Sequence, residues 1–107
     1  MKNIRIENQS GLRFNVVRAS GGNLVGICQS LAITVQSETW VSLLEDIAQT
    51  LNLLFADLLE DGELDEFLRD RGFRLLDALP AKPDDAWFDI PFSPTMTAER
   101  DSPATFS

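Results

Sequence analysis

Apolar and polar residues alternate in the first part of the chain. Leu12, Phe14 and Val16 are separated by single polar residues. Because successive side chains of a strand point to opposite faces of a sheet, this period of two predicts a strand with one buried face. Ile4 and Ile6 show the same spacing, and they either extend this strand or precede it.

Two further short strands are predicted to complete an antiparallel meander. Residues 20–23, Ser-Gly-Gly-Asn, tolerate the positive φ angles of a tight hairpin, so Leu24–Cys28 should return beside the first strand. A short connection at residues 29–30 follows. The alternation then resumes over Leu31–Gln36 and predicts the third strand.

A long amphipathic helix should follow these strands. Ser37-Glu38-Thr39 offers an N-cap and an acidic side chain for the first turn. From Trp40 to Leu59, apolar residues recur every three or four positions. So wide an apolar face has to be buried against a sheet together with another element or another subunit. Leu53 falls in the polar arc of this helix, and it is either an ordinary exposed leucine or a partner contact.

A short second helix and a fourth strand are predicted next. Glu63–Arg71 keeps its apolar residues on one side, and Gly72 suits the C′ position that ends a helix. The mostly apolar segment Phe73–Asp77 could add a fourth strand. The expected fold is therefore α+β, with a three- to four-stranded, mainly antiparallel sheet packed against one long and one short helix in the order β-β-β-α-α-β.

The composition changes sharply near residue 80. All five prolines lie at or after Pro80. We therefore expect an α+β domain over residues 1–79 and a proline-containing acidic tail over residues 80–107, whose last part is predicted to be disordered. Residues 86–92 (AWFDIPF) are dense in large apolar groups. Such a segment either docks on a partner's sheet or pocket, or folds back to cap the core of its own subunit.

The charge of the chain is acidic and unevenly distributed. At 107 residues with 44% hydrophobic residues, the chain is long enough for one compact domain with a tail. Its formal net charge is −8, with +3 over residues 1–37 and −11 over residues 38–107. Such a surface repels nucleic acid and anionic lipid and attracts a basic protein. The acidic residues could also serve solubility alone.

The sequence contains no recognisable catalytic or metal-binding motif. With no histidine and the single cysteine Cys28, neither an internal disulfide nor a structural zinc site nor a redox pair can be assembled within one chain. The acidic run from Asp57 to Asp70 lacks the spacing of a calcium-binding loop. We therefore expect no catalytic residue, no metal and no cofactor, and we interpret the chain as a non-enzyme. A metal-dependent enzyme at the acidic run is the alternative.

The sequence also indicates where the chain works. Residues 1–11 lack the apolar stretch of a signal peptide, and no segment is apolar enough to span a membrane, so a soluble, cytoplasmic protein without a membrane partner is expected. Arg5, Arg13 and Arg18 could form a DNA-reading ribbon. Three arginines in a negative field are too few for the usual phosphate contacts, so no direct nucleic-acid partner is expected.

A hairpin, a third strand and a helix follow one another between Asn23 and Ile47. The sequences are LVGIC at residues 24–28, LAITVQSET at residues 31–39 and the leucine-rich helix that comes next. In this order and spacing they resemble the HicB-like antitoxin family. The resemblance covers Leu12 to Phe73, and GELDEFLRDRGF at residues 62–73 is similar to what some members carry next. Family members have a Pro-Gly turn where this chain has Gln29-Ser30.

The resemblance implies both a fold and a partner. The fold is a partial ribonuclease-H-like core that lacks catalytic acids. The partner is HicA, a small basic ribonuclease toxin that the antitoxin binds and masks. Many family members add a C-terminal DNA-binding domain, for which residues 80–107 leave no room.

The residues expected to contact a partner lie mainly in the aromatic segment. Apolar anchors and steering carboxylates are expected there, and the helix adds one leucine. The expected partner-binding residues are Trp87, Phe88, Ile90, Phe92, Asp84, Asp85, Asp89 and Leu53. A homodimer or higher oligomer is also expected. The alternative function is a stand-alone structural or oligomerisation module with no toxin partner.

Overall fold

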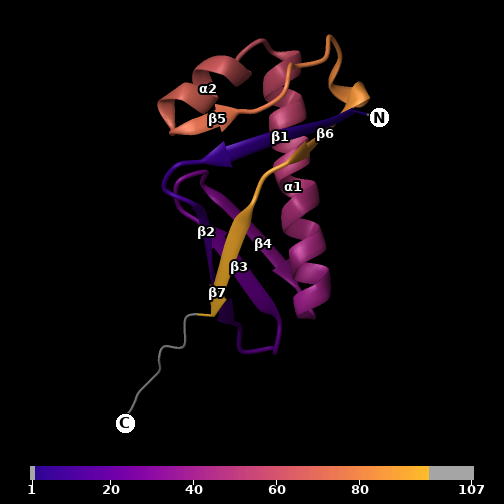
Figure 1. Cartoon of the computed structure of the whole chain (residues 1–107). Helices are drawn as coiled ribbons and strands as arrows, with labels where there is room; N and C mark the ends of the chain where they lie inside the picture. The colour runs from indigo at the N-terminus through magenta and orange to yellow at the C-terminus, as the bar shows by residue number, and fades with distance from the viewer. Residues whose placement is uncertain (1, 97–107) are drawn as a thin grey trace. The chain divides into compact units, whose positions relative to one another are not determined.

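The strands form two mixed sheets rather than the single sheet expected, and they accompany one long and one short helix (Figure 1). The computed structural model describes residues 2–96. In chain order the elements are β1 (Lys2–Asn8), β2 (Leu12–Arg18), β3 (Leu24–Cys28), β4 (Ile33–Ser37), α1 (Trp40–Glu60), α2 (Leu64–Asp70), β5 (Phe73–Leu75), the 3₁₀ helix η1 (Pro83–Asp85), β6 (Ala86–Asp89) and β7 (Phe92–Met96). The strand orders are β5-β1-β6 and β4-β3-β2-β7. The α+β class is confirmed.

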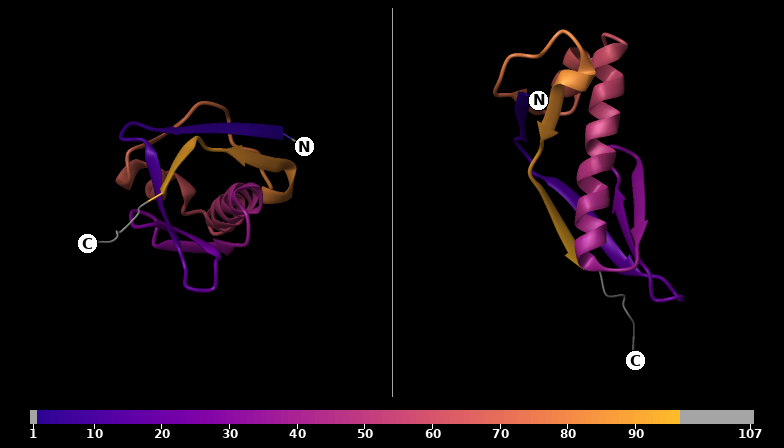
Figure 2. Two further views of the ribbon diagram at one scale, coloured as in Figure 1. Left: turned by 90° about the horizontal axis from the view of Figure 1, so that it is seen from below. Right: turned by 90° about the vertical axis from the view of Figure 1, so that its right-hand side faces the viewer.

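The described residues divide into two compact units, one for each sheet. The three-stranded unit consists of residues 2–12 and 48–91, and the four-stranded unit of residues 13–47 and 92–96. Helix α1 is continuous (Figure 2) and contributes residues to both. The segment expected as a tail supplies β6 to the first unit and β7 to the second. Its residues 97–107, predicted to be disordered, lie outside the described part of the chain.

A turn after β1 explains why the N-terminal alternation gives two strands. The Ser10 N–H donates to the side-chain Oδ1 of Asn8 at 2.9 Å, and Gly11 adopts a φ of +77°, which other residues rarely take. β1 thereby separates from β2 and becomes the middle strand of its own sheet. Of the two alternatives for Ile4 and Ile6, a separate preceding strand is the observed one.

β1 is paired on both sides by strands from the second half of the chain. It is antiparallel to β5, with Ile6 opposite Leu75, and parallel to β6, with Ile4 opposite Phe88. The fourth strand predicted after the short helix is confirmed at Phe73–Leu75. Its expected place in the same sheet as the meander is wrong, because its partner is β1 and not one of the strands β2–β4.

Phe55 of α1 occupies the centre of the core of the three-stranded unit. Its side chain is fully buried. The rings of Phe67, Phe73 and Phe88 meet it edge-on, with centroids 5.9, 5.8 and 5.9 Å away. Aromatic quadrupoles favour this T-shaped arrangement. One helix residue thus joins α2, β5 and β6 into a single core.

Arg5 of β1 fixes the chain just after β5. Its backbone N–H and its Nε both donate to Oδ2 of Asp77, at 2.9 and 3.1 Å, and its Nη2 donates to Oδ1 at 3.2 Å. The side-chain hydrogen bonds from Arg5 lower the pKa of Asp77 below its ordinary value of 3.8, and the Arg5 N–H and the positive charges of Arg5 and Lys2 act in the same direction.

We expect Asp77 to titrate below its ordinary pKa in an NMR titration of the side-chain carboxyls, and Arg5→Gln to move that pKa upward. Because the folded-state pKa is depressed, the ion pair stabilises the fold above the unfolded-state pKa, and this stabilisation is lost as the pH falls through the folded-state pKa. Arg13→Gln, at an exposed arginine of the other unit, is the control. An Asp77 pKa that is unchanged in Arg5→Gln would contradict the ion pair between Arg5 and Asp77.

The β2–β3–β4 meander of the four-stranded unit forms as the alternation predicts. The β2–β3 hairpin closes with the Ala19 N–H donating to the Asn23 carbonyl at 2.7 Å, and Gly22 supplies the positive φ, +92°. Both strand pairs are antiparallel. β4 begins at Ile33, two residues later than expected, because Ala32 has a φ of +56° and belongs to the turn.

Helix α1 packs on this meander over a glycine. A Cβ added at Gly26 would lie 3.6–3.7 Å from side-chain carbons of Leu43, Ile47 and Phe14. These are ordinary van der Waals distances, so the first turns of the helix lie directly on Gly26 and alanine would also fit there. Cys28 is buried in the same face of β3, and its Sγ lies within hydrogen-bonding distance, 3.4 Å, of Ser30 Oγ.

Capping residues mark where α1 begins and where both helices end. Thr39 is the N-cap of α1, since its Oγ1 accepts the Ser42 N–H at 3.1 Å. Glu38 precedes this cap, so the acidic first turn expected for α1 is wrong. Gly62 and Gly72, with φ of +73° and +75°, follow α1 and α2, and the second confirms the expected helix stop.

Candidate partner-binding groove

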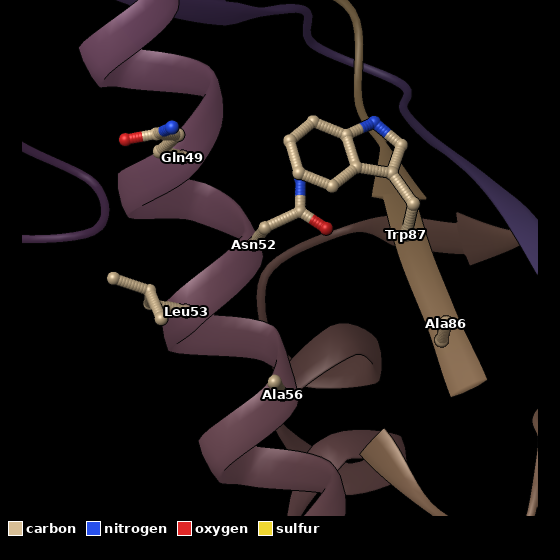
Figure 3. A pocket seen from close by; sticks show the side chains of 6 residues that line it. All are labelled: Gln49, Asn52, Leu53, Ala56, Ala86 and Trp87. Carbon is tan, nitrogen blue, oxygen red and sulfur yellow. The ribbon is translucent and has the colours of Figure 1, made fainter. Parts of the chain in front are cut away.

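A groove of about 340 Å³ lies in the three-stranded unit between α1 and β6 (Figure 3). Its lining residues are Gln49, Asn52, Leu53, Ala56, Ala86 and Trp87. Asn52 and Trp87 point toward each other, while Gln49 and Leu53 project from the helix in the direction away from Trp87 in this view (Figure 3). The lining therefore combines apolar side chains of both elements with the two amides of Gln49 and Asn52.

Two of the residues predicted to contact a partner line this groove. Leu53 of α1 is 68% exposed, and Trp87 of β6 is 38% exposed. The sequence predicts them separately, Leu53 from its place in the polar arc of a helix and Trp87 from an aromatic segment. Large apolar side chains that remain accessible around one groove are typical of a binding surface.

Asn52 joins the two walls of the groove and is almost buried, at 9% exposure. Its Nδ2 donates to the Phe88 carbonyl at 2.8 Å and to the Ala48 carbonyl at 3.1 Å, and its Oδ1 accepts the Phe88 N–H at 2.5 Å. The side-chain amide thus pairs with Phe88 as the peptide of a neighbouring strand would. The sequence does not single out Asn52, because a partner 36 residues away leaves no local pattern.

The other predicted apolar anchors lie elsewhere. Phe88 and Ile90 are buried in the three-stranded unit, at 2% and 5% exposure. Phe92 is half-buried in the four-stranded unit, with its ring edge-on to Phe14 at 5.6 Å. In this structure these three side chains pack within the chain itself, and Trp87 is the exposed one of the four predicted apolar anchors.

The surroundings of the groove are acidic. Asp84, Asp85 and Asp89 are exposed next to Ala86 and Trp87 in the sequence, and Asp57 and Glu60 are exposed on α1 one turn after Leu53 and Ala56. Three cations oppose them: Arg5 lies opposite Asp89 and Lys2 opposite Ala86 in the β1–β6 pair, and Lys82 precedes Asp84 by two residues. Within residues 2–12 and 48–91 there are twelve acidic and six basic side chains, a net charge of −6.

Metal sites and membrane spans were considered for this sequence, and residues 2–96 show neither. Among them, no three carboxylate or thiol groups are close enough to hold a metal ion. In the same part of the chain, no helix is long and apolar enough to cross a membrane.

No family model matches the chain, and neither a curated protein nor a solved structure is significantly similar to it.

Proposed function

We propose that this chain is a non-enzymatic, HicB-like antitoxin-type protein that binds and masks a small basic ribonuclease toxin of the HicA kind. The observation that carries the proposal is the groove between α1 and β6, where Leu53 and Trp87 are exposed within a unit of net charge −6. The order of β2, β3, β4 and α1 also supports it, since the family resemblance implies a hairpin, a third strand and a helix in that order.

The groove and its charges would play different roles in binding. Trp87 and Leu53 supply the large apolar contacts that dominate the energy of protein interfaces. The surrounding carboxylates attract a basic surface and speed the encounter more than they tighten the complex. A ribonuclease binds RNA through its own positive surface. An acidic protein bound to that surface would pair with the positive charges that RNA needs, and it would therefore exclude RNA.

Replacing Leu53 by lysine should weaken binding of a basic HicA-like ribonuclease by about tenfold or more, because it places a charged ammonium group in the apolar wall. Trp87→Ala should act in the same direction. Binding is measured by calorimetry with a purified HicA-like ribonuclease, and masking by the cleavage of RNA by that ribonuclease. These substitutions test the groove more specifically than a deletion of residues 81–107, because the deletion would remove β6 and β7.

Val41→Lys is the matched control, since Val41 is also 68% exposed on α1 but belongs to the other unit. It should leave binding and masking unchanged. The proposal is wrong if Leu53→Lys and Val41→Lys bind the ribonuclease equally well, or if the wild-type chain leaves RNA cleavage unaffected.

A second candidate function is a stand-alone structural or oligomerisation module. A different surface favours it, the exposed apolar side chains of Trp40, Val41 and Leu44 at the start of α1. This function predicts that the chain self-associates and that Leu53→Lys leaves the self-association unchanged. It also predicts that the chain binds no ribonuclease.

A further inference from the structure

The edge strands of the two sheets differ in how they are protected. Unpaired strand edges invite pairing with another chain, and proteins protect them with charged side chains, proline or a covering group. In the described sheets, β5 is only three residues long and carries Arg74, β6 is closed by the Asn52 amide, and β7 contains Pro94. β4 has the sequence ITVQS, with neither charge nor proline.

β4 also presents side chains suited to a dimer contact. It is the last strand in the order β4-β3-β2-β7, and its Thr34 and Gln36 are exposed. Three residues after its end, α1 begins with three accessible apolar side chains: Trp40 is 37% exposed, Val41 68% and Leu44 38%. Pairing of a five-residue strand alone would be a small interface, and these side chains add apolar area to it.

The charges favour a second copy as the occupant of this edge. When two identical surfaces associate, like charges come together and repel each other. This repulsion disfavours self-association through the unit of net charge −6. The four-stranded unit carries two basic and three acidic side chains within residues 13–47 and 92–96, a net charge of −1. A basic partner would be drawn to the other unit instead. A strand edge is also complementary to itself when the two strands run antiparallel.

We propose that β4 pairs antiparallel with β4 of a second copy, with Trp40, Val41 and Leu44 of both copies in the same interface. The two four-stranded sheets then form one continuous eight-stranded sheet across the two-fold axis. This dimer does not depend on the proposed ribonuclease partner. The groove between α1 and β6 belongs to the other unit.

Sedimentation equilibrium of the full chain tests the dimer. The wild-type protein should approach twice the 11.9 kDa mass of one chain as its concentration rises. Thr34→Lys and Val41→Lys should each raise the dimer dissociation constant about tenfold, through repulsion at the strand edge and loss of apolar contact.

Each substitution has a matched control. Asn15, Ile27 and Thr34 lie opposite one another across β2, β3 and β4, so Asn15→Lys adds the same charge in the same row but on an interior strand. Leu53→Lys makes an equivalent change at an equally exposed residue of α1. Both controls should leave the dissociation constant unchanged, and circular dichroism checks that all four variants are folded.

The proposal is overturned if the wild-type chain stays monomeric at every concentration. It is equally overturned if Thr34→Lys and Asn15→Lys have the same effect, or if Leu53→Lys dissociates the dimer and Val41→Lys does not. Loss of ribonuclease binding with the dimer intact would concern only the proposed function.

Discussion

Phe55→Ala is expected to reduce the free energy of unfolding of the three-stranded unit by about 4 kcal/mol. Phe55 is fully buried, and three rings from three different elements pack edge-on against it. Its removal creates a cavity and deletes all three ring contacts at once. Since small domains are stable by only about 5–15 kcal/mol, this is enough to unfold much of the unit at moderate urea concentrations.

The two tryptophans allow the unfolding of each unit to be monitored separately. Trp87 belongs to the three-stranded unit and Trp40 to the four-stranded unit. Urea unfolding of Phe55→Ala in a Trp40→Phe background therefore reports on the affected unit through Trp87 fluorescence. The comparison variant is Phe92→Ala of the four-stranded unit, followed through Trp40 fluorescence in a Trp87→Phe background. It removes a half-buried ring that packs on Phe14 and should cost only about 1–2 kcal/mol. Equal losses for the two variants would refute a central role for Phe55.

Asn52→Asp is expected to have the second largest effect, a loss of about 3 kcal/mol at pH 7. The wild-type amide donates to the Phe88 carbonyl and accepts the Phe88 N–H. An ionised carboxylate can only accept, so it would face the carbonyl oxygen without a proton between them, in a nearly buried position. The neutral carboxyl group can make both hydrogen bonds.

The loss should therefore depend on pH with a definite sign. The fold favours the neutral form, so the folded-state pKa of the introduced carboxyl group rises above its ordinary value of about 3.9. Below that ordinary value the variant should be nearly as stable as the wild type. Its stability relative to the wild type then falls as the pH rises, until the folded-state pKa is passed.

Urea unfolding of both proteins from pH 3.5 to 8 measures this difference. Asn52→Leu is the control, because it removes the same hydrogen bonds without adding a titratable group, and its loss should be independent of pH. An Asn52→Asp loss that is the same at both ends of the pH range would show that the amide of Asn52 does not bridge α1 and β6 as described.

The parts of the fold that depend on neighbouring residues could be predicted from the sequence. The hairpin at residues 20–23, the strands around it and the helix from Trp40 to Glu60 follow from alternation, glycine and a threonine cap. The second sheet could not be predicted. It brings Ile4 beside Phe88 in a parallel pair, and nothing within a short window of sequence records a partner so far along the chain.

The same limit applies to the candidate site. Leu53 and Trp87 could each be selected, one as a leucine on a polar helix face and one as part of an aromatic segment. That they line one groove depends on β6, which the sequence pattern places in a tail, and on Asn52, which joins β6 to the helix. The segment at residues 86–92 also divides its apolar groups between the core and the surface, because a strand turns successive side chains to opposite faces.

The pairing of β1 has a consequence for the order in which the chain folds during synthesis. β1 is made first, yet one of its partners ends at Leu75 and the other at Asp89. The meander β2–β3–β4 needs only neighbouring residues, and local contacts form faster than distant ones. On the ribosome, β1 should therefore remain unpaired, with Ile4 and Ile6 exposed, until most of the chain has been translated.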